Sequence, residues 1–268
     1  MKNTLLLLLV LSSCSFRLHA QEQDEVMYSM YRYHPIETIR KLGVDSVFIH
    51  TFKEDTNYLS GIITYDTLGR ETKYMDVEGG YEYQMGYYPS GLLKSSRIID
   101  YNYGNGPVDS FAYNKKGCLT HSFNGMNGDY TIRNYKYRRG RLMEESGDRF
   151  KYKYLYKKGK RISNDFYADN GKVVQSQKLY EYDKNGNLYK IYESDGEKWL
   201  NFQLFYNSQN LLTQMKVFGK GLKLSQQYTT VYYESGLINH KIWQTGIKNN
   251  DPANCNYQKN IYTYSYRN

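Results

Sequence analysis

The sequence predicts an all-β protein made of tandem antiparallel β-hairpins that form an extended or spiralling meander sheet. Aromatic residues alternate with polar ones at period two, and turn signals recur along the chain. The 32 tyrosines supply much of the apolar surface, since a tyrosine ring can be buried while its hydroxyl stays bonded or wet. A closed barrel or a small propeller is the architectural alternative.

The repeat unit is an aromatic pair followed by a turn. Tyr65-Asp66-Thr67-Leu68-Gly69 and Tyr182-Asp183-Lys184-Asn185-Gly186 are two examples. The same turn recurs eight times, at residues 69, 91, 117, 140, 159, 186, 210 and 236. Internal similarity at this spacing indicates a repeat architecture.

Each unit also contains a second turn, so the chain should fold into about sixteen short strands. Asn-Gly, Asp-Gly and Gly-Gly pairs tolerate the positive φ that tight hairpins need. These second turns are expected at Gly79-Gly80, Gly104-Asn105-Gly106, Asn127-Gly128, Gly147, Asn170-Gly171, Asp195-Gly196, Gly219 to Gly221 and near Asn249-Asn250.

The strands should carry one aromatic face and one mostly wet face. Tyr135 and Tyr137 flank Lys136, and Tyr152 and Tyr154 flank Lys153. Such alternation is typical of a sheet with one face packed on the core.

The N-terminus has the features of an export signal. Lys2 precedes an apolar run that is too short to span a bilayer, and Ala20-Gln21 provides a small residue for cleavage. We therefore assign residues 1–20 as a signal peptide. The alternative is a lipoprotein signal over residues 1–13, with Cys14 acylated. Cleavage after Ala20 would lower the net charge from +9 to +7, because Lys2 and Arg17 are lost and no acid is.

Residues 21–44 should form a leader that contains one short helix, and residues 45–268 the repeat domain. A proline before the helix and a glycine after it predict helix from Ile36 to Leu42, ending at Gly43. The mature chain keeps Cys118 and Cys255, which are too few for a disulfide scaffold. We expect no bridge between them in an open array, because more than five units separate them.

The units that begin at Tyr65 and Tyr182 resemble the YD repeat, Tyr-Asp-x-x-Gly-x-Leu, of the Rhs and teneurin family. The resemblance covers roughly residues 60 to 240. It implies side-by-side hairpins in a cell-surface or secreted protein that serves as shell, adhesin or carrier. The resemblance does not imply catalytic activity.

No motif for catalysis or metal binding stands out. The histidines His34, His50, His121 and His240 are scattered without ligand spacing, and there is no nucleophile elbow, phosphate loop or calcium loop. Trp199 and Trp243 could stack on a sugar, but strand aromatics covering the sheet are the simpler interpretation. We expect no cofactor and no bound metal, and we expect the protein not to be an enzyme.

Basic residues concentrate in the middle of the chain. Residues 133–161 hold twelve Lys or Arg against three acids. Three consecutive turns in or just before this region carry a pair of bases ahead of the glycine, namely Lys115-Lys116, Arg138-Arg139 and Lys157-Lys158. Stacked hairpins would align the pairs in a row, at steps of about 10 Å. The alternative is that these tips are simply solvated.

These observations favour an exported, non-enzymatic binding or structural module at a bacterial surface, located in the periplasm, outside the cell or at the outer surface. Its expected partner is an acidic surface polysaccharide or another polyanion, bound at those six bases, or else an envelope protein. We expect no nucleic-acid partner and no transmembrane span. A glycan-degrading enzyme and a structural component of an envelope or secretion complex are the competing interpretations.

Overall fold

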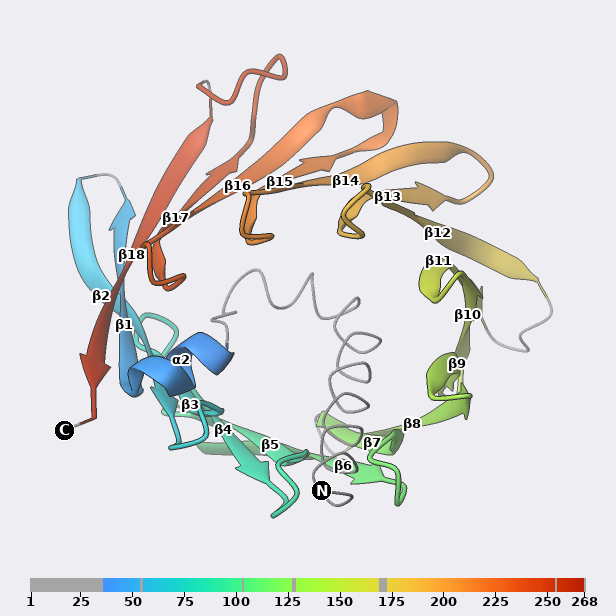
Figure 1. The fold of residues 1–268 in the computed structure, drawn as a ribbon, viewed down its shortest axis with the longest axis horizontal. Helices are drawn as coiled ribbons and strands as arrows, with labels where there is room; N and C mark the ends of the chain where they lie inside the picture. Colours follow the sequence, from blue (N-terminus) through green and yellow to red (C-terminus); the bar gives the residue numbers. More distant parts are fainter. Residues whose placement is uncertain are drawn as a thin grey trace, which may run out of the picture.

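The computed structural model describes residues 36–53, 55–102, 104–126, 129–168, 173–253 and 255–267. They form one α-helix, one short 3₁₀ turn and eighteen strands (Figure 1). The elements are α2 (Ile36–Leu42), β1 (Val44–Lys53), β2 (Thr56–Tyr65), β3 (Glu71–Asp76), β4 (Tyr81–Tyr87), β5 (Leu93–Asp100), β6 (Gly104–Tyr113), β7 (Leu119–Met126), β8 (Asp129–Arg138), β9 (Arg141–Ser146), β10 (Phe150–Lys157), β11 (Lys160–Ala168), β12 (Val174–Tyr182), β13 (Leu188–Ser194), β14 (Lys198–Tyr206), β15 (Leu212–Phe218), η1 (Lys220–Leu222), β16 (Leu224–Tyr232), β17 (Ile238–Thr245) and β18 (Asn256–Tyr266).

The sheet closes on itself, so the expected open or spiralling meander is wrong and the alternative of a closed barrel is correct. Each strand pairs antiparallel with the next, and the last strand pairs with the first. In the closing pair, Val47 lies opposite Tyr264 and Ile49 opposite Tyr262. The pairing of β1 with β18 gives each of these strands a second partner, and a closed barrel leaves no unpaired edge.

The helix predicted over residues 36–42 is present as α2, and Gly43 has the positive φ of 63° expected of a helix stop. In Figure 1, α2 lies on the inner side of the ring. Its Ile39 belongs to a buried cluster that includes Val47, Ile63 and Tyr262. Residues paired across neighbouring strands point to the same face of a sheet. The residues in register with Val47 and Tyr262 therefore form the inner face of the barrel wall.

The inner face is rich in tyrosine, as the alternation predicts. Tyr154 is buried and Tyr152 half-buried, whereas Lys153 between them is exposed. A second inner cluster packs six buried side chains from β12 to β15: Tyr180, Leu188, Ile191, Phe202, Leu204 and Met215. The ring is thus held together from inside by aromatic and aliphatic contacts.

Five tyrosine hydroxyls connect neighbouring units of the wall. The tyrosine that ends one unit donates to the backbone carbonyl of the second residue after the preceding unit's turn. The pairs are Tyr87 to Glu71 (2.6 Å), Tyr182 to Arg161 (2.9 Å), Tyr206 to Leu188 (2.8 Å), Tyr232 to Leu212 (2.9 Å) and Tyr264 to Ile238. We call this set the tyrosine ladder. It explains why tyrosine, and not phenylalanine, ends these units.

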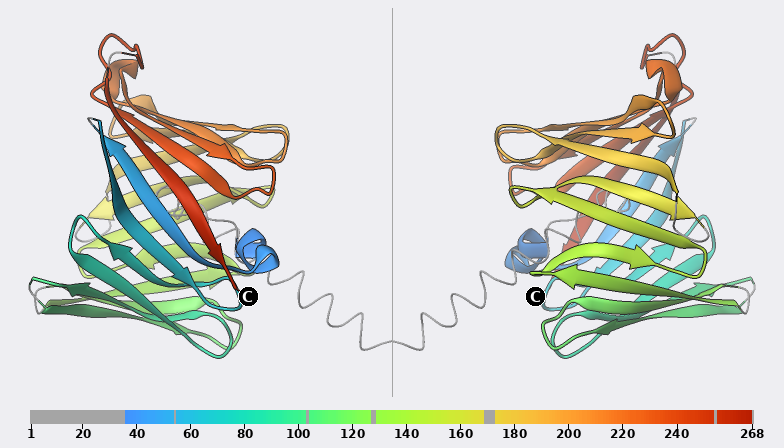
Figure 2. Two further views of the ribbon diagram at one scale, coloured as in Figure 1. Left: turned by 90° about the vertical axis from the view of Figure 1, so that its left-hand side faces the viewer. Right: turned by 90° about the vertical axis from the view of Figure 1, so that its right-hand side faces the viewer.

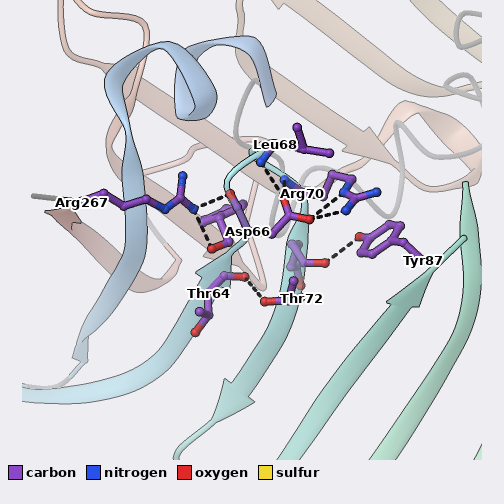
Figure 3. Close-up of polar contacts among 9 residues, drawn as sticks. Thr64, Asp66, Leu68, Arg70, Thr72, Tyr87 and Arg267 are labelled. Carbon is purple, nitrogen blue, oxygen red and sulfur yellow. Dashed lines mark hydrogen bonds and ion pairs between the residues drawn. The ribbon is translucent and has the colours of Figure 1, made fainter. Parts of the chain in front are cut away.

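The turns of the repeat are stabilised by their first residue. The Asp66 carboxylate accepts the backbone N–H groups of Leu68 (2.9 Å) and Arg70 (3.0 Å), and it pairs with the Arg70 guanidinium (Figure 3). Burial works to raise the pKa of Asp66, but these hydrogen bonds outweigh it and hold the pKa below its usual value. Asn114 and Asn207 bind their turns in the same way.

The C-terminus fastens the closing seam. The Arg267 guanidinium donates to the backbone carbonyls of Tyr65 (2.8 Å) and Asp66, and its backbone N–H donates to the Gly43 carbonyl (2.8 Å) (Figure 3). Residues more than 200 positions apart are thereby joined beside α2.

The second turns differ in one detail from the expectation. The predicted turn at Gly104-Asn105-Gly106 falls inside β6, which begins at Gly104, because the chain reverses earlier, at Tyr101 and Asn102. The turns predicted at Asn127-Gly128 and Asn170-Gly171 lie outside the described residues.

Candidate polyanion-binding rim

The three predicted base pairs lie at one end of the barrel. They occupy the β6–β7, β8–β9 and β10–β11 turns, and alternate turns of an antiparallel ring share one end (Figure 2). Because β7 pairs with β8 and β9 with β10, the three turns are neighbours along the rim. We call the part of the rim formed by Lys115, Lys116, Arg138, Arg139, Arg141, Lys157, Lys158 and Lys160 the basic arc.

Contacts between successive turns hold the arc together. The Arg141 guanidinium lies over the Tyr156 ring, with its central carbon 5.8 Å from the ring centroid, and the Lys160 ammonium lies 4.9 Å from that of Tyr182. In both cases the base follows one turn and the ring ends the next unit. These cation–π contacts keep the two bases on the rim while leaving their polar groups accessible.

The three turns of the arc are of two kinds. Asn114 caps a four-residue turn that carries Lys115 and Lys116, with its side-chain oxygen accepting the Lys116 N–H at 2.9 Å. The next two turns are shorter and have no capping side chain. Arg139 and Lys158 there adopt positive φ, 51° and 49°.

Positive φ at Arg139 and Lys158 conflicts with local preference. The left-handed conformation costs a non-glycine residue roughly 1–2 kcal/mol, and Asn, Asp or Gly are the usual choices. Backbone strain of this kind tends to cluster at functional sites. The chain thus keeps a base at the tip of each hairpin where asparagine would be more stable.

The charges of the arc are available to solvent. The six predicted bases are exposed. Within the described chain, no ion pair includes Arg138, Arg139, Lys157 or Lys158. The neighbouring acids are occupied elsewhere: Glu144 binds Lys136 at 2.7 Å, and Glu145 binds Arg133 at 3.0 Å and accepts the Tyr154 hydroxyl.

The arc covers only part of the rim. On one side the next turn, β12–β13, carries Asp183 as well as Lys184. On the other side the β4–β5 turn from Tyr88 to Leu92 has no charged residue, and in the β2–β3 turn beyond it Asp66 pairs with Arg70. Three adjacent turns thus carry bases with no acid in the turns themselves, so this part of the rim has a one-sided positive field. Such a surface can attract an extended anion along its length.

Other predicted residues lie apart from the arc. Cys118 follows the β6–β7 turn at the same end, while Cys255 precedes β18 at the opposite end, so ring closure does not bring them together. Trp243 stacks on Tyr228 at 5.8 Å, as expected of a wall aromatic. Cys14, both signal-peptide boundaries and His34 lie outside the described residues.

Neither metal ligands nor membrane-spanning helices are found in the described part of the chain. No group of three or more His, Cys, Asp or Glu side chains there could hold a metal ion. No helix among the described elements is long and apolar enough to cross a membrane.

The fold and the arc together define a class: a closed, single-layer barrel of hairpin repeats with a tyrosine-rich inner wall and a basic rim. No family model matches the chain, and no curated protein does. Among solved structures it is similar to a porin-like protein from Bacteroides uniformis ATCC 8492, with 14% identity and a TM-score of 0.45, covering 83% of this chain and 98% of the other. A porin-like protein from Bacteroides vulgatus ATCC 8482 gives 12% identity and a TM-score of 0.39, covering 84% and 99%. The TcdB2-TccC3-Cdc42 structure gives 15% and 0.35, covering 80% of this chain and 12% of that one.

Proposed function

We propose that this protein is an exported, non-enzymatic binding module of a bacterial cell surface, built of YD-type repeats, and that its basic arc binds acidic glycans or other polyanions. The observation that carries the proposal is the run of exposed bases on three adjacent turns. Two of these bases are kept in a strained backbone conformation that a binding role would justify.

Geometry favours a polymer over a single small anion. Two strand spacings separate adjacent turns, so the arc presents positive charge at steps of about 10 Å over its length. This exceeds the Debye length of about 8 Å at physiological salt, so each turn attracts its own negative group. Affinity should therefore rise with the number of charges on the polymer and fall steeply with salt.

The test compares two variants of equal net charge. The arc variant carries Ser at Lys115, Lys116, Arg138 and Lys157, and Asn at Arg139 and Lys158, because asparagine tolerates positive φ. The control variant replaces six exposed bases elsewhere with Ser: Lys41, Lys53, Arg97, Arg149, Lys223 and Lys248. Binding to heparin, alginate and polygalacturonate is measured at low and physiological salt, with neutral dextran as a blank.

The parent and the control variant should bind the acidic polymers, and the arc variant should not. If each exposed contact contributes about 0.5 kcal/mol, six contacts amount to roughly 3 kcal/mol, or about a hundredfold in affinity. Both variants should unfold near the parent's temperature, because all twelve replaced side chains are exposed. Equal binding by the two variants, or no binding by the parent at low salt, would refute the proposal.

A further inference from the structure

A hollow of about 370 Å³ lies at the end of the barrel opposite the basic arc. It is formed where the β13–β14 hairpin meets the loop between β15 and β16, elements that lie in the upper part of the ring in Figure 1. Its lining includes Tyr192, Glu197, Lys198, Trp199 and Leu222. A cavity of this size, lined by aromatic and aliphatic groups with a few polar ones, is typical of small-ligand sites.

Two lysines of the hollow lie over its aromatic rings. The Lys220 ammonium lies 4.7 Å from the Trp199 ring centroid and binds both carboxylate oxygens of Asp195, at 2.8 and 3.0 Å. Lys198 lies 4.0 Å from the Tyr192 ring centroid. Lys220 thus reaches from the β15–β16 loop to the hairpin tip and lies over the Trp199 ring.

The loop that forms one wall is strained. Gly221 and Leu222 both have positive φ, 78° and 57°. Leucine has no side-chain group to satisfy the backbone locally, so this conformation is unfavourable for it. Leu222 is also 58% exposed, so burial in the protein's own core does not repay the strain. Leu222 thus combines a backbone conformation that is unfavourable for leucine with an exposed apolar side chain. This is the pattern expected where a side chain contacts a ligand.

The chemistry of the lining fits a sugar ring. A pyranose has an apolar face of C–H groups, which suits an indole or phenol ring, and an edge of hydroxyls that both donate and accept hydrogen bonds. Trp199 and Leu222 supply the apolar contact, the Lys198 ammonium donates, and the Glu197 carboxylate accepts. The Lys220–Asp195 pair is half-exposed and therefore weak, so an entering ring can move the ammonium aside.

We propose that this hollow is a carbohydrate subsite that binds one pyranose unit against Trp199. The subsite is independent of the basic arc, because the two lie at opposite ends of the barrel and share no residue. Loss of one should leave the other intact.

The test exploits the fact that the chain has only two tryptophans. Trp243→Phe leaves Trp199 as the sole indole, and Trp199→Phe is the matched control. Fluorescence of each variant is titrated with methyl β-glucopyranoside, methyl β-galactopyranoside, N-acetylglucosamine and galacturonic acid. At least one sugar should change the emission of Trp243→Phe in a saturable manner, with a Kd on the order of millimolar. Trp199→Phe should not respond.

A second variant separates binding from folding. Leu222→Gly removes the strained wall and should lower the affinity for the responsive sugar at least threefold, while the thermal midpoint stays the same or rises. The proposal is overturned if none of the four sugars gives a saturable change, if both single-tryptophan variants respond equally, or if Leu222→Gly binds like the parent. Binding of the apolar dye ANS near Trp199 without any sugar response would assign the hollow to an apolar ligand instead.

Discussion

The tyrosine ladder makes a quantitative prediction about single hydroxyl groups. Tyr206 donates to the Leu188 carbonyl at 2.8 Å, and burial raises the pKa of its phenol well above the usual value, so the group is held neutral and in place. Tyr206→Phe keeps the ring and removes only the donor. The loss is one net hydrogen bond, about 1 kcal/mol, plus part of the cost of a carbonyl left without its partner, giving roughly 1–2 kcal/mol in total.

The assay compares the free energies of unfolding in urea of Tyr206→Phe and Tyr257→Phe, with unfolding monitored by circular dichroism. Tyr257 is 50% exposed and serves as control, so its variant should stay within about 0.5 kcal/mol of the parent. For a chain of this size, the Tyr206 variant should also melt about 2–4 °C lower per kcal/mol lost. If the two variants are equally stable, the hydroxyl ladder does not join the units and ring packing alone does.

Three further outcomes are expected. Gly69→Ala should destabilise the protein more than Gly140→Ala. Both positions have positive φ, which costs alanine about 1 kcal/mol, but only at Gly69 would the new Cβ lie 2.8 Å from the Ile36 carbonyl oxygen. Equal urea midpoints for the two variants would contradict the packing of α2 against this turn. Arg267→Ala should cost about 1.5–3 kcal/mol, because hydrogen bonds from a charged group close the seam, and native-state hydrogen exchange should then rise first in β1 and β18. Burial raises the pKa of Tyr87 to about 12 and raises those of several other wall tyrosines, so the native state holds protons that the unfolded chain releases from about pH 10 upward. These groups should thus leave the stability unaffected below about pH 10 and lower it above that pH. A pH titration in which tyrosinate absorbance reaches its full value before ellipticity is lost would refute this.

The sequence predicted those features of the fold that depend on residues close together in the chain. The helix over residues 36–42 follows from its flanking proline and glycine, and the hairpin turns follow from their Asp, Asn and Gly residues. Period-two alternation around Lys153 correctly separates the tyrosine face from the wet face. Each of these features depends on neighbours in sequence, so one sequence is enough to predict it.

Closure of the ring could not be predicted in this way. The partners of Val47 on β18 lie more than 200 residues away, and every strand of the array has similar alternation. No strand is marked as an edge, so an open sheet and a barrel have the same sequence pattern. The predicted number of strands was also too low: the described residues form eighteen where about sixteen were expected, because β1 and β18 lie outside the eight repeat turns.

The candidate site was predicted in composition but not in conformation. Exposure and adjacency of the tip bases follow from the repeat. The positive φ of Arg139 and Lys158 was missed, although a signal existed: only two residues separate Tyr137 from Gly140, where three separate Tyr65 from Gly69, so the turn is too short for a capping residue. The strain at Leu222 has no comparable signal, since it arises from how the β15–β16 loop meets the neighbouring hairpin.

Closure of the ring depends on the pairing of β18 with both β1 and β17. If Asn256–Tyr266 were removed, both neighbours would present unpaired edges, and the contacts of Arg267 with Tyr65 and Gly43 would be lost as well. Exposed edges of this length promote association with other chains. A variant that lacks residues 256–267 should therefore aggregate and be cleaved by proteases more readily than the protein in which β18 is in place.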